Sequence, residues 1–282
     1  MKHRVIDVVC NLLTPDIIAG RPLWTRSFHS AMNKSNRVGG VDLDEHVAMM
    51  DEAGVDLAFL IAPKMGRRGL PGSWEMDVRH IIEATEKYPD RFRGLAGINP
   101  FDGVAGLKEL QLLVENYGFV GAHAYPHWFG LAIDHRRWYP YIAKCGELGI
   151  PLQTQVGRCL RYTDEQPLPD VGFPHTLDTI ACDFPEVDIV GIHTGWPWVE
   201  EMISVADKHP NVYISIDAYA PRYLPASLVH YMKSWGAGKV MFGTDWPIIE
   251  MKRAIVEIGD MDLSPEAERS LFSGVAEKVY EL

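Results

Sequence analysis

The chain has 282 residues, of which 47% are hydrophobic and 23% are charged, and its formal net charge is −11. This composition is typical of a soluble globular protein whose length allows either two average domains or one large barrel. The acidic balance argues against a nucleic-acid partner, and because the sequence has no run of about 18 apolar residues, no membrane span is predicted.

Short apolar runs alternate with amphipathic helical patterns along the whole chain. Several of the runs are almost entirely apolar, as expected of parallel strands that are covered on both faces. Eight strand–helix units in this length favour a single-domain α/β fold, a (β/α)8 TIM barrel over residues 1–282, rather than two doubly wound halves. The predicted strands are residues 5–9, 57–62, 94–98, 119–124, 151–156, 189–193, 212–217 and 239–243.

Other local signals mark the helices and one long connection. Residues 42–45 form a capping-box pattern, Gly54 is a helix stop, and Ser264 before Pro265 predicts the start of a helix. Segment 11–41 interrupts the alternation. Because a loop after the first strand of a barrel lies over its active-site mouth, we interpret this segment as a lid or an oligomer contact, with no preference between them.

The cysteines and the N-terminus indicate a cytoplasmic protein. The four cysteines, Cys10, Cys145, Cys159 and Cys182, are widely spaced without a C-x-x-C pattern, which is typical of reduced thiols. The apolar stretch at the N-terminus is interrupted at Asp7, unlike a signal peptide.

Two strand ends carry side chains suited to catalysis. The sequence I-V-G-I-H-T-G-W places His193 directly after an apolar strand, and V-M-F-G-T-D-W-P places Asp245 in the same way. Active sites of barrels lie at the carboxyl ends of the strands. Taken alone, His193 can be a hydrogen-bonded structural residue and Asp245 an Asx-turn or helix cap. Their joint occurrence two strand units apart favours one catalytic site.

Polar and aromatic side chains at the other strand ends are candidates for substrate binding. Arg158 or Arg222 can pair with a substrate carboxylate in bidentate fashion. For His127, the alternative to substrate binding is an exposed position on the surface. An aromatic mouth, predicted from Trp24, Tyr125, Trp196, Tyr219 and Trp246, suits a small planar or ring-derived acid. The predicted substrate-binding residues are Asn11, His123, Tyr125, His127, Gln155, Arg158, Trp196, Asp217 and Arg222.

Four stretches together resemble the amidohydrolase-related family, which includes aminocarboxymuconate semialdehyde decarboxylase and its relatives. They are I-D-V-V-C-N-L-L-T-P at 6–15, I-H-T-G-W at 192–196, F-G-T-D-W-P at 242–247 and S-G-V-A-E-K-V-Y at 273–280. The resemblance spans the chain. It implies a barrel with one divalent metal, often zinc, held by a His-x-His after strand 1, a His on strand 5 and an Asp on strand 8, with a further His on strand 6 for substrate or protons.

The chain departs from this family pattern at the metal ligands. The strand 1 pair falls on Val9 and Asn11 and the strand 5 histidine on Gln155, whereas His193 and Asp245 match. Valine has no donor atom, and amide oxygens are weak zinc ligands. We therefore predict no family-type zinc site and assign no metal ligand. A divalent zinc, manganese or magnesium ion stays open as an alternative, for example Mg²⁺ among the oxygens of Asp245, Asn11 and Gln155.

Without zinc, the retained pair predicts proton chemistry. Asp245 is expected to be the general base and His193 the acid or the group that polarises a carbonyl. The predicted function is hydrolysis of a lactone, ester or amide in a small carboxylic acid. The alternatives are a metal-dependent decarboxylase of the same family and a non-catalytic ligand-binding barrel. We expect a homo-oligomer with a small-molecule substrate, and neither a nucleic-acid nor a membrane partner.

Overall fold

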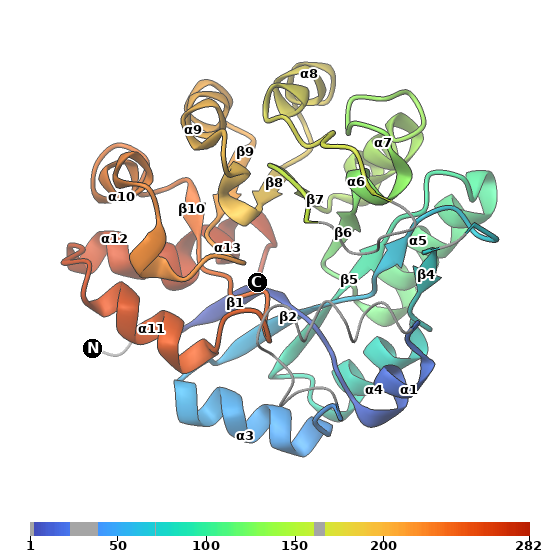
Figure 1. Ribbon diagram of the computed structural model, residues 1–282, viewed down its shortest axis with the longest axis horizontal. Helices are drawn as coiled ribbons and strands as arrows, with labels where there is room; N and C mark the ends of the chain where they lie inside the picture. Colours follow the sequence, from blue (N-terminus) through green and yellow to red (C-terminus); the bar gives the residue numbers. More distant parts are fainter. Residues whose placement is uncertain (1–2, 23–38, 71, 161–166) are drawn as a thin grey trace.

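Buried apolar runs form eight parallel strands that follow one another around a barrel (Figure 1). The computed structural model describes residues 3–22, 39–70, 72–160 and 167–282. Strand order equals chain order, so the predicted (β/α)8 barrel is confirmed. The barrel strands are β1 (Ile6–Cys10), β2 (Leu57–Ile61), β5 (Phe92–Gly97), β6 (Gly121–Ala124), β7 (Leu152–Gln155), β8 (Ile189–Ile192), β9 (Val212–Ser215) and β10 (Val240–Met241).

The barrel closes between β10 and β1 through hydrogen bonds that continue beyond the end of β10. Val8 N–H donates to Phe242 O (3.1 Å), and Asp245 N–H donates to Val9 O (2.8 Å). β10 is shorter than predicted because the Phe242 N–H donates to Leu271 O and not to a neighbouring strand. Closure therefore brings the residues after β10 beside the end of β1.

Helices cover the outside of the barrel (Figure 1). The cap of α3 agrees with the sequence pattern, because Asp42 accepts from Glu45 N–H (2.8 Å) and Gly54 has φ 82°. None of the helices in the described parts of the chain is long and apolar enough to cross a membrane. The helices are α1 (Pro15–Gly20), α3 (Leu43–Ala53), α4 (Arg79–Lys87), α5 (Gly103–Tyr117), α6 (Pro126–Phe129), α7 (Tyr139–Leu148), α8 (His175–Asp183), α9 (Val199–Lys208), α10 (Ala226–Lys233), α11 (Met251–Gly259), α12 (Pro265–Arg269) and α13 (Val275–Val279).

Segment 11–41 contains a short helix that the sequence did not predict. α1 has Pro15 at its first turn and buries Ile17 and Ile18. An antiparallel hairpin of β3 (Lys64–Met65) and β4 (Trp74–Glu75) follows β2. Residues 23–38, and Trp24 with them, lie outside the described residues. The interpretation of this segment as a lid or an oligomer contact therefore stays a prediction.

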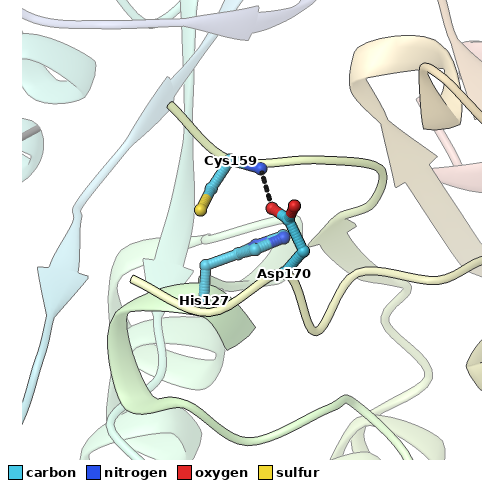
Figure 2. Close-up of side chains that lie close together, drawn as sticks. All are labelled: His127, Cys159 and Asp170. Atoms are coloured by element: carbon cyan, nitrogen blue, oxygen red, sulfur yellow. Dashed lines mark hydrogen bonds between the residues drawn. The ribbon is translucent and has the colours of Figure 1, made fainter. Parts of the chain in front are cut away.

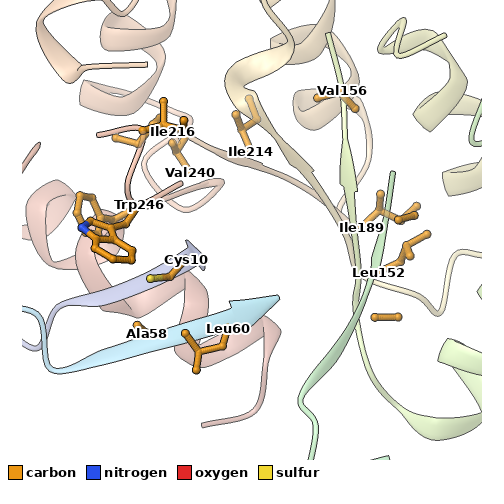
Figure 3. Packing of buried hydrophobic residues seen from close by; sticks show 14 of the residues in the cluster. Cys10, Ala58, Leu60, Leu152, Val156, Ile189, Ile214, Ile216, Val240 and Trp246 are labelled. Carbon is orange, nitrogen blue, oxygen red and sulfur yellow. The ribbon is translucent and has the colours of Figure 1, made fainter. Parts of the chain in front are cut away.

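Side chains on the outer face of the strands pack against the helices (Figure 3). Cys10 and Trp246 belong to this layer, and both are fully buried. The Cys10 thiol lies 3.6 Å from Nε2 of His46, which is on α3, and the Trp246 ring centroid lies 4.5 Å from that of His46. Trp246 therefore does not contribute to the barrel mouth, and this part of the aromatic prediction was wrong. The Cys10 thiol is thus part of the packing between strand and helix.

Candidate active site

The backbone turns sharply where β8, β9 and β10 end. Four non-glycine residues have left-handed backbone conformations there: His193 (φ 66°), Thr194 (φ 57°), Ala218 (φ 65°) and Asp245 (φ 52°). Each such residue costs on the order of 1–3 kcal/mol, and strain of this kind concentrates at functional sites. The turns fix the directions of the side chains that follow the strands.

His193, Asp217 and Asp245 meet at this end of the barrel. Each offers one atom, and these atoms lie within 4.8 Å of one another. Nδ1 of His193 lies 2.5 Å from Oδ2 of Asp217, and the His193 N–H donates to Asp217 Oδ1 (2.9 Å). Asp217 is fully buried. Asp217 therefore orients the imidazole ring through Nδ1 and leaves Nε2 available to bind a substrate or carry a proton.

The Asp245 carboxyl is positioned from the end of β1. Nδ2 of Asn11 donates to Asp245 Oδ1 (2.8 Å) and to Trp246 O (2.9 Å). Burial raises the pKa of Asp245 to about 6, against the lowering effects of the His193 charge and the Asn11 hydrogen bond. Near neutral pH this carboxyl is therefore mostly ionised and can accept a proton.

The pKa of His193 is shifted in the direction that favours imidazolium. Burial lowers the pKa, but the charge and the hydrogen bond of Asp217 outweigh burial, and the charge of Asp245 adds to them. The net pKa lies above the ordinary value of histidine. A protonated ring held through Nδ1 can donate from Nε2 to a carbonyl oxygen.

A second buried carboxyl, Asp7, supports the strand end that carries Asp245. Its Oδ2 accepts from the Thr244 hydroxyl (2.5 Å), and its Oδ1 accepts from the N–H groups of Thr244 (3.0 Å) and Val9 (3.2 Å). Burial raises the pKa of Asp7 to about 7, although these hydrogen bonds lower it. Asp7 thus ties β1 to the residue just before Asp245.

His123 and Tyr125 lie deeper in the barrel mouth, at the end of β6. Nδ1 of His123 lies 2.6 Å from Gln153 Oε1, and the rings of His123 and Tyr125 are 4.4 Å apart. Burial lowers the pKa of His123 to about 3, so this ring is neutral. Its pKa also responds to the charges of His193 and Asp217, which places it beside the catalytic candidates.

His127 is buried, so its alternative as a surface residue was wrong. Its Nε2 lies 2.9 Å from Gly157 O, which identifies Nε2 as the protonated nitrogen. Figure 2 shows the ring beside Cys159 and Asp170, whose carboxylate accepts from the Cys159 N–H (2.9 Å). Gln155, also buried, interacts with the His127 side chain. These residues form one wall of the mouth.

The arginines take up two different positions. Arg158 is exposed at the rim, with its guanidinium carbon 5.6 Å from the Trp196 ring centroid, and Trp196 is 39% exposed. Arg222 lies outside the cluster, because its Nε is 3.5 Å from Glu257 on α11. Neither arginine contacts the catalytic candidates through an ion pair within the described residues.

The residues present do not fit the zinc site that the resemblance implies. Val9 is a buried apolar side chain, and Asn11 presents its N–H₂ group, not an oxygen, to Asp245. Nδ1 of His193 and both oxygens of Asp217 are used by their mutual hydrogen bonds. With Gln155 in place of the strand 5 histidine, the chain thus lacks three of the imidazole ligands that zinc prefers at these positions.

Two further clusters have metal-ligating side chains, but their atoms serve other groups. His127, Cys159 and Asp170 are one cluster; Gly157 O occupies the Nε2 of the histidine, and burial raises the pKa of the thiol to about 11. The other, Asp178, Cys182 and His209, lies on the outer helices, where Asp178 already pairs with His209 and Lys208. We therefore derive no step through a metal.

Residues 29–282 match the family described as Amidohydrolase. The match includes the strand ends with His193, Asp217 and Asp245. The chain belongs to the amidohydrolase family. No curated protein matches this amidohydrolase.

Solved structures show the same fold at low sequence identity. An uncharacterised TIM-barrel protein from Bordetella bronchiseptica is 23% identical, covers 98% of each chain and has a TM-score of 0.78. A 5-carboxyvanillate decarboxylase from Novosphingobium aromaticivorans, with manganese bound, is 18% identical over 99% of this chain and 97% of its own, with a TM-score of 0.71. A probable 2-pyrone-4,6-dicarboxylic acid hydrolase from Acinetobacter baumannii is 15% identical over 99% and 100%, with a TM-score of 0.65. A decarboxylase and a probable hydrolase therefore share this fold.

Proposed function

We propose that this amidohydrolase hydrolyses a lactone, ester or amide in a small carboxylic acid, with Asp245 as the general base and no family-type metal. The observation that supports the proposal most is the partly buried Asp245 carboxyl beside a His193 ring that Asp217 binds through Nδ1. One oxygen of Asp245 is engaged by Asn11, so the other is left for a water molecule.

In this reaction the ionised Asp245 takes a proton from water while the water oxygen forms a bond to the carbonyl carbon. Protonated His193 donates a hydrogen bond from Nε2 to the carbonyl oxygen, where negative charge develops in the transition state. The tetrahedral intermediate then breaks its bond to the leaving oxygen or nitrogen, which receives the proton held by Asp245. Asp217 supports the imidazolium with its negative charge.

Decarboxylation is the second candidate, because a carboxyl with a pKa of about 6 can also donate a proton. A carbon that loses carbon dioxide would take this proton from Asp245 in its acid form. Solved decarboxylases with this fold include one with bound manganese, whereas the ligand set of this chain does not fit a family-type metal.

Product analysis in ¹⁸O-labelled water separates the two reactions. Carboxylate-bearing lactones and esters, and matched hydroxybenzoic acids, are incubated with the purified chain. Hydrolysis predicts an acid product that contains one labelled oxygen, without release of carbon dioxide. Release of carbon dioxide from the aromatic acids, with intact lactones and esters, would overturn the proposal. The expected homo-oligomer and cytoplasmic location stay predictions.

A further inference from the structure

Arg21, which the sequence interpretation overlooked, has no carboxylate partner among the residues that the structure describes. It follows α1, and its N–H donates to Ile18 O (3.2 Å). Its guanidinium carbon lies 4.8 Å from the centroid of the Trp74 ring on β4. The Nε atom is buried and has no hydrogen-bond partner in the described parts of the chain.

A partly buried guanidinium whose Nε is inaccessible and unpartnered is costly unless an anion compensates it. Burial lowers the pKa of Arg21 to about 10, so the side chain stays protonated at neutral pH. The charge effect that opposes this shift comes from Tyr125 and not from a carboxylate of the described residues. The described residues therefore place the aromatic ring of Trp74, but no negative charge, beside the Arg21 guanidinium.

A series of neighbouring side chains leads from Arg21 to the catalytic candidates. The neighbour of Arg21, Tyr125, directly follows β6, and the Tyr125 ring packs on His123, whose pKa responds to His193 and Asp217. On the other side, Asn11 at the end of β1 binds Asp245. The segment that leads from β1 through α1 thus carries both Asn11, which binds the proposed base, and a cation that no carboxylate of the described residues pairs.

The chemistry of an arginine fork matches a carboxylate. Stacking on an aromatic ring leaves the edge of the guanidinium available for two parallel N–H···O bonds. We propose that Arg21 binds a carboxylate of the substrate and so selects small acids that carry this group apart from the bond being broken. The inference deepens the proposed hydrolase function and rests on it for the reaction, but carboxylate binding by itself does not require turnover.

Calorimetric titration of the full chain with benzoate, and with benzamide as its neutral counterpart, tests this site. Arg21→Met removes the charge and keeps the length of the side chain. Arg137→Met is the matched control, because Arg137 also stacks on an aromatic ring, 4.5 Å from the Phe101 centroid, but is exposed. Benzoate affinity is expected to fall by at least about tenfold in Arg21→Met and to be unchanged in Arg137→Met, with benzamide binding equal in all three proteins.

The melting temperature shows whether the variant is folded. Because Arg21 is partly buried and has no counterion among the described residues, Arg21→Met is expected to melt no earlier than the parent protein. Equal benzoate affinity in parent and Arg21→Met, or the absence of benzoate binding to the parent, would overturn the inference. If benzoate binds through Arg21 but no lactone or ester is hydrolysed, the carboxylate site stands and the proposed reaction fails.

Discussion

Asp245→Asn is expected to lower kcat for hydrolysis by about 10²–10⁴-fold, the usual contribution of a general base. The amide has nearly the shape of the carboxyl, still offers an oxygen to Asn11 and tolerates the left-handed backbone at φ 52°. It cannot, however, take a proton from water. Steady-state kinetics and a thermal melt on the same preparation measure both consequences.

Asp262→Asn is the matched control for this substitution. Asp262 also has a left-handed backbone (φ 53°) but is exposed, away from the barrel mouth between α11 and α12. Its kcat and melting temperature are expected to equal those of the parent. If Asp245→Asn kept its turnover and lost stability instead, Asp245 would be a structural turn residue, and the proposed base would be wrong.

Asp217→Asn has the second largest expected effect, a loss of about 10²–10³-fold in kcat together with a shifted pH profile. In the parent, kcat/KM is expected to fall as pH drops through about 6, where Asp245 becomes protonated. It is also expected to fall as pH rises through the raised pKa of His193, where the imidazolium is lost. The profile is therefore a bell.

Removing the Asp217 charge moves both limbs of this bell in the same direction. The charge of Asp217 raises the pKa of His193 and also that of Asp245, so both limbs are expected at lower pH in Asp217→Asn. Asp178→Asn is the control, because Asp178 also accepts from a histidine ring, that of His209 (2.7 Å), on the outer helices. If both apparent pKa values of the pH profile were unchanged in Asp217→Asn, the role of Asp217 beside His193 would be contradicted.

The strands could be predicted because parallel strands are buried on both faces and so read as continuous apolar runs. The positions of His193 and Asp245 followed from the same logic, since His193 comes directly after β8 and Asp245 lies in the turn that follows β10. β8 and β9 are neighbours in the barrel, so Asp217 after β9 lies close enough to bind His193 after β8. Strand order alone could have predicted this pair.

Other features depend on contacts that a linear pattern does not contain. Trp246 is buried outside the barrel because successive residues point to opposite sides, so the neighbour of an inward Asp245 faces outward. α1 has only six residues, too few to show a helical period. Arg222 is held by Glu257, which is distant in sequence. Arg21 was overlooked because its segment was interpreted as a loop.

Turnover before and after exhaustive chelation, with the metal content of the same samples measured by plasma mass spectrometry, tests the metal-independent site most directly. The three family histidines are replaced by Val9, Asn11 and Gln155. We therefore expect an unchanged kcat in protein that holds far less than one metal ion per chain. Activity that disappears on chelation and returns with one equivalent of zinc or manganese would contradict the proposed mechanism.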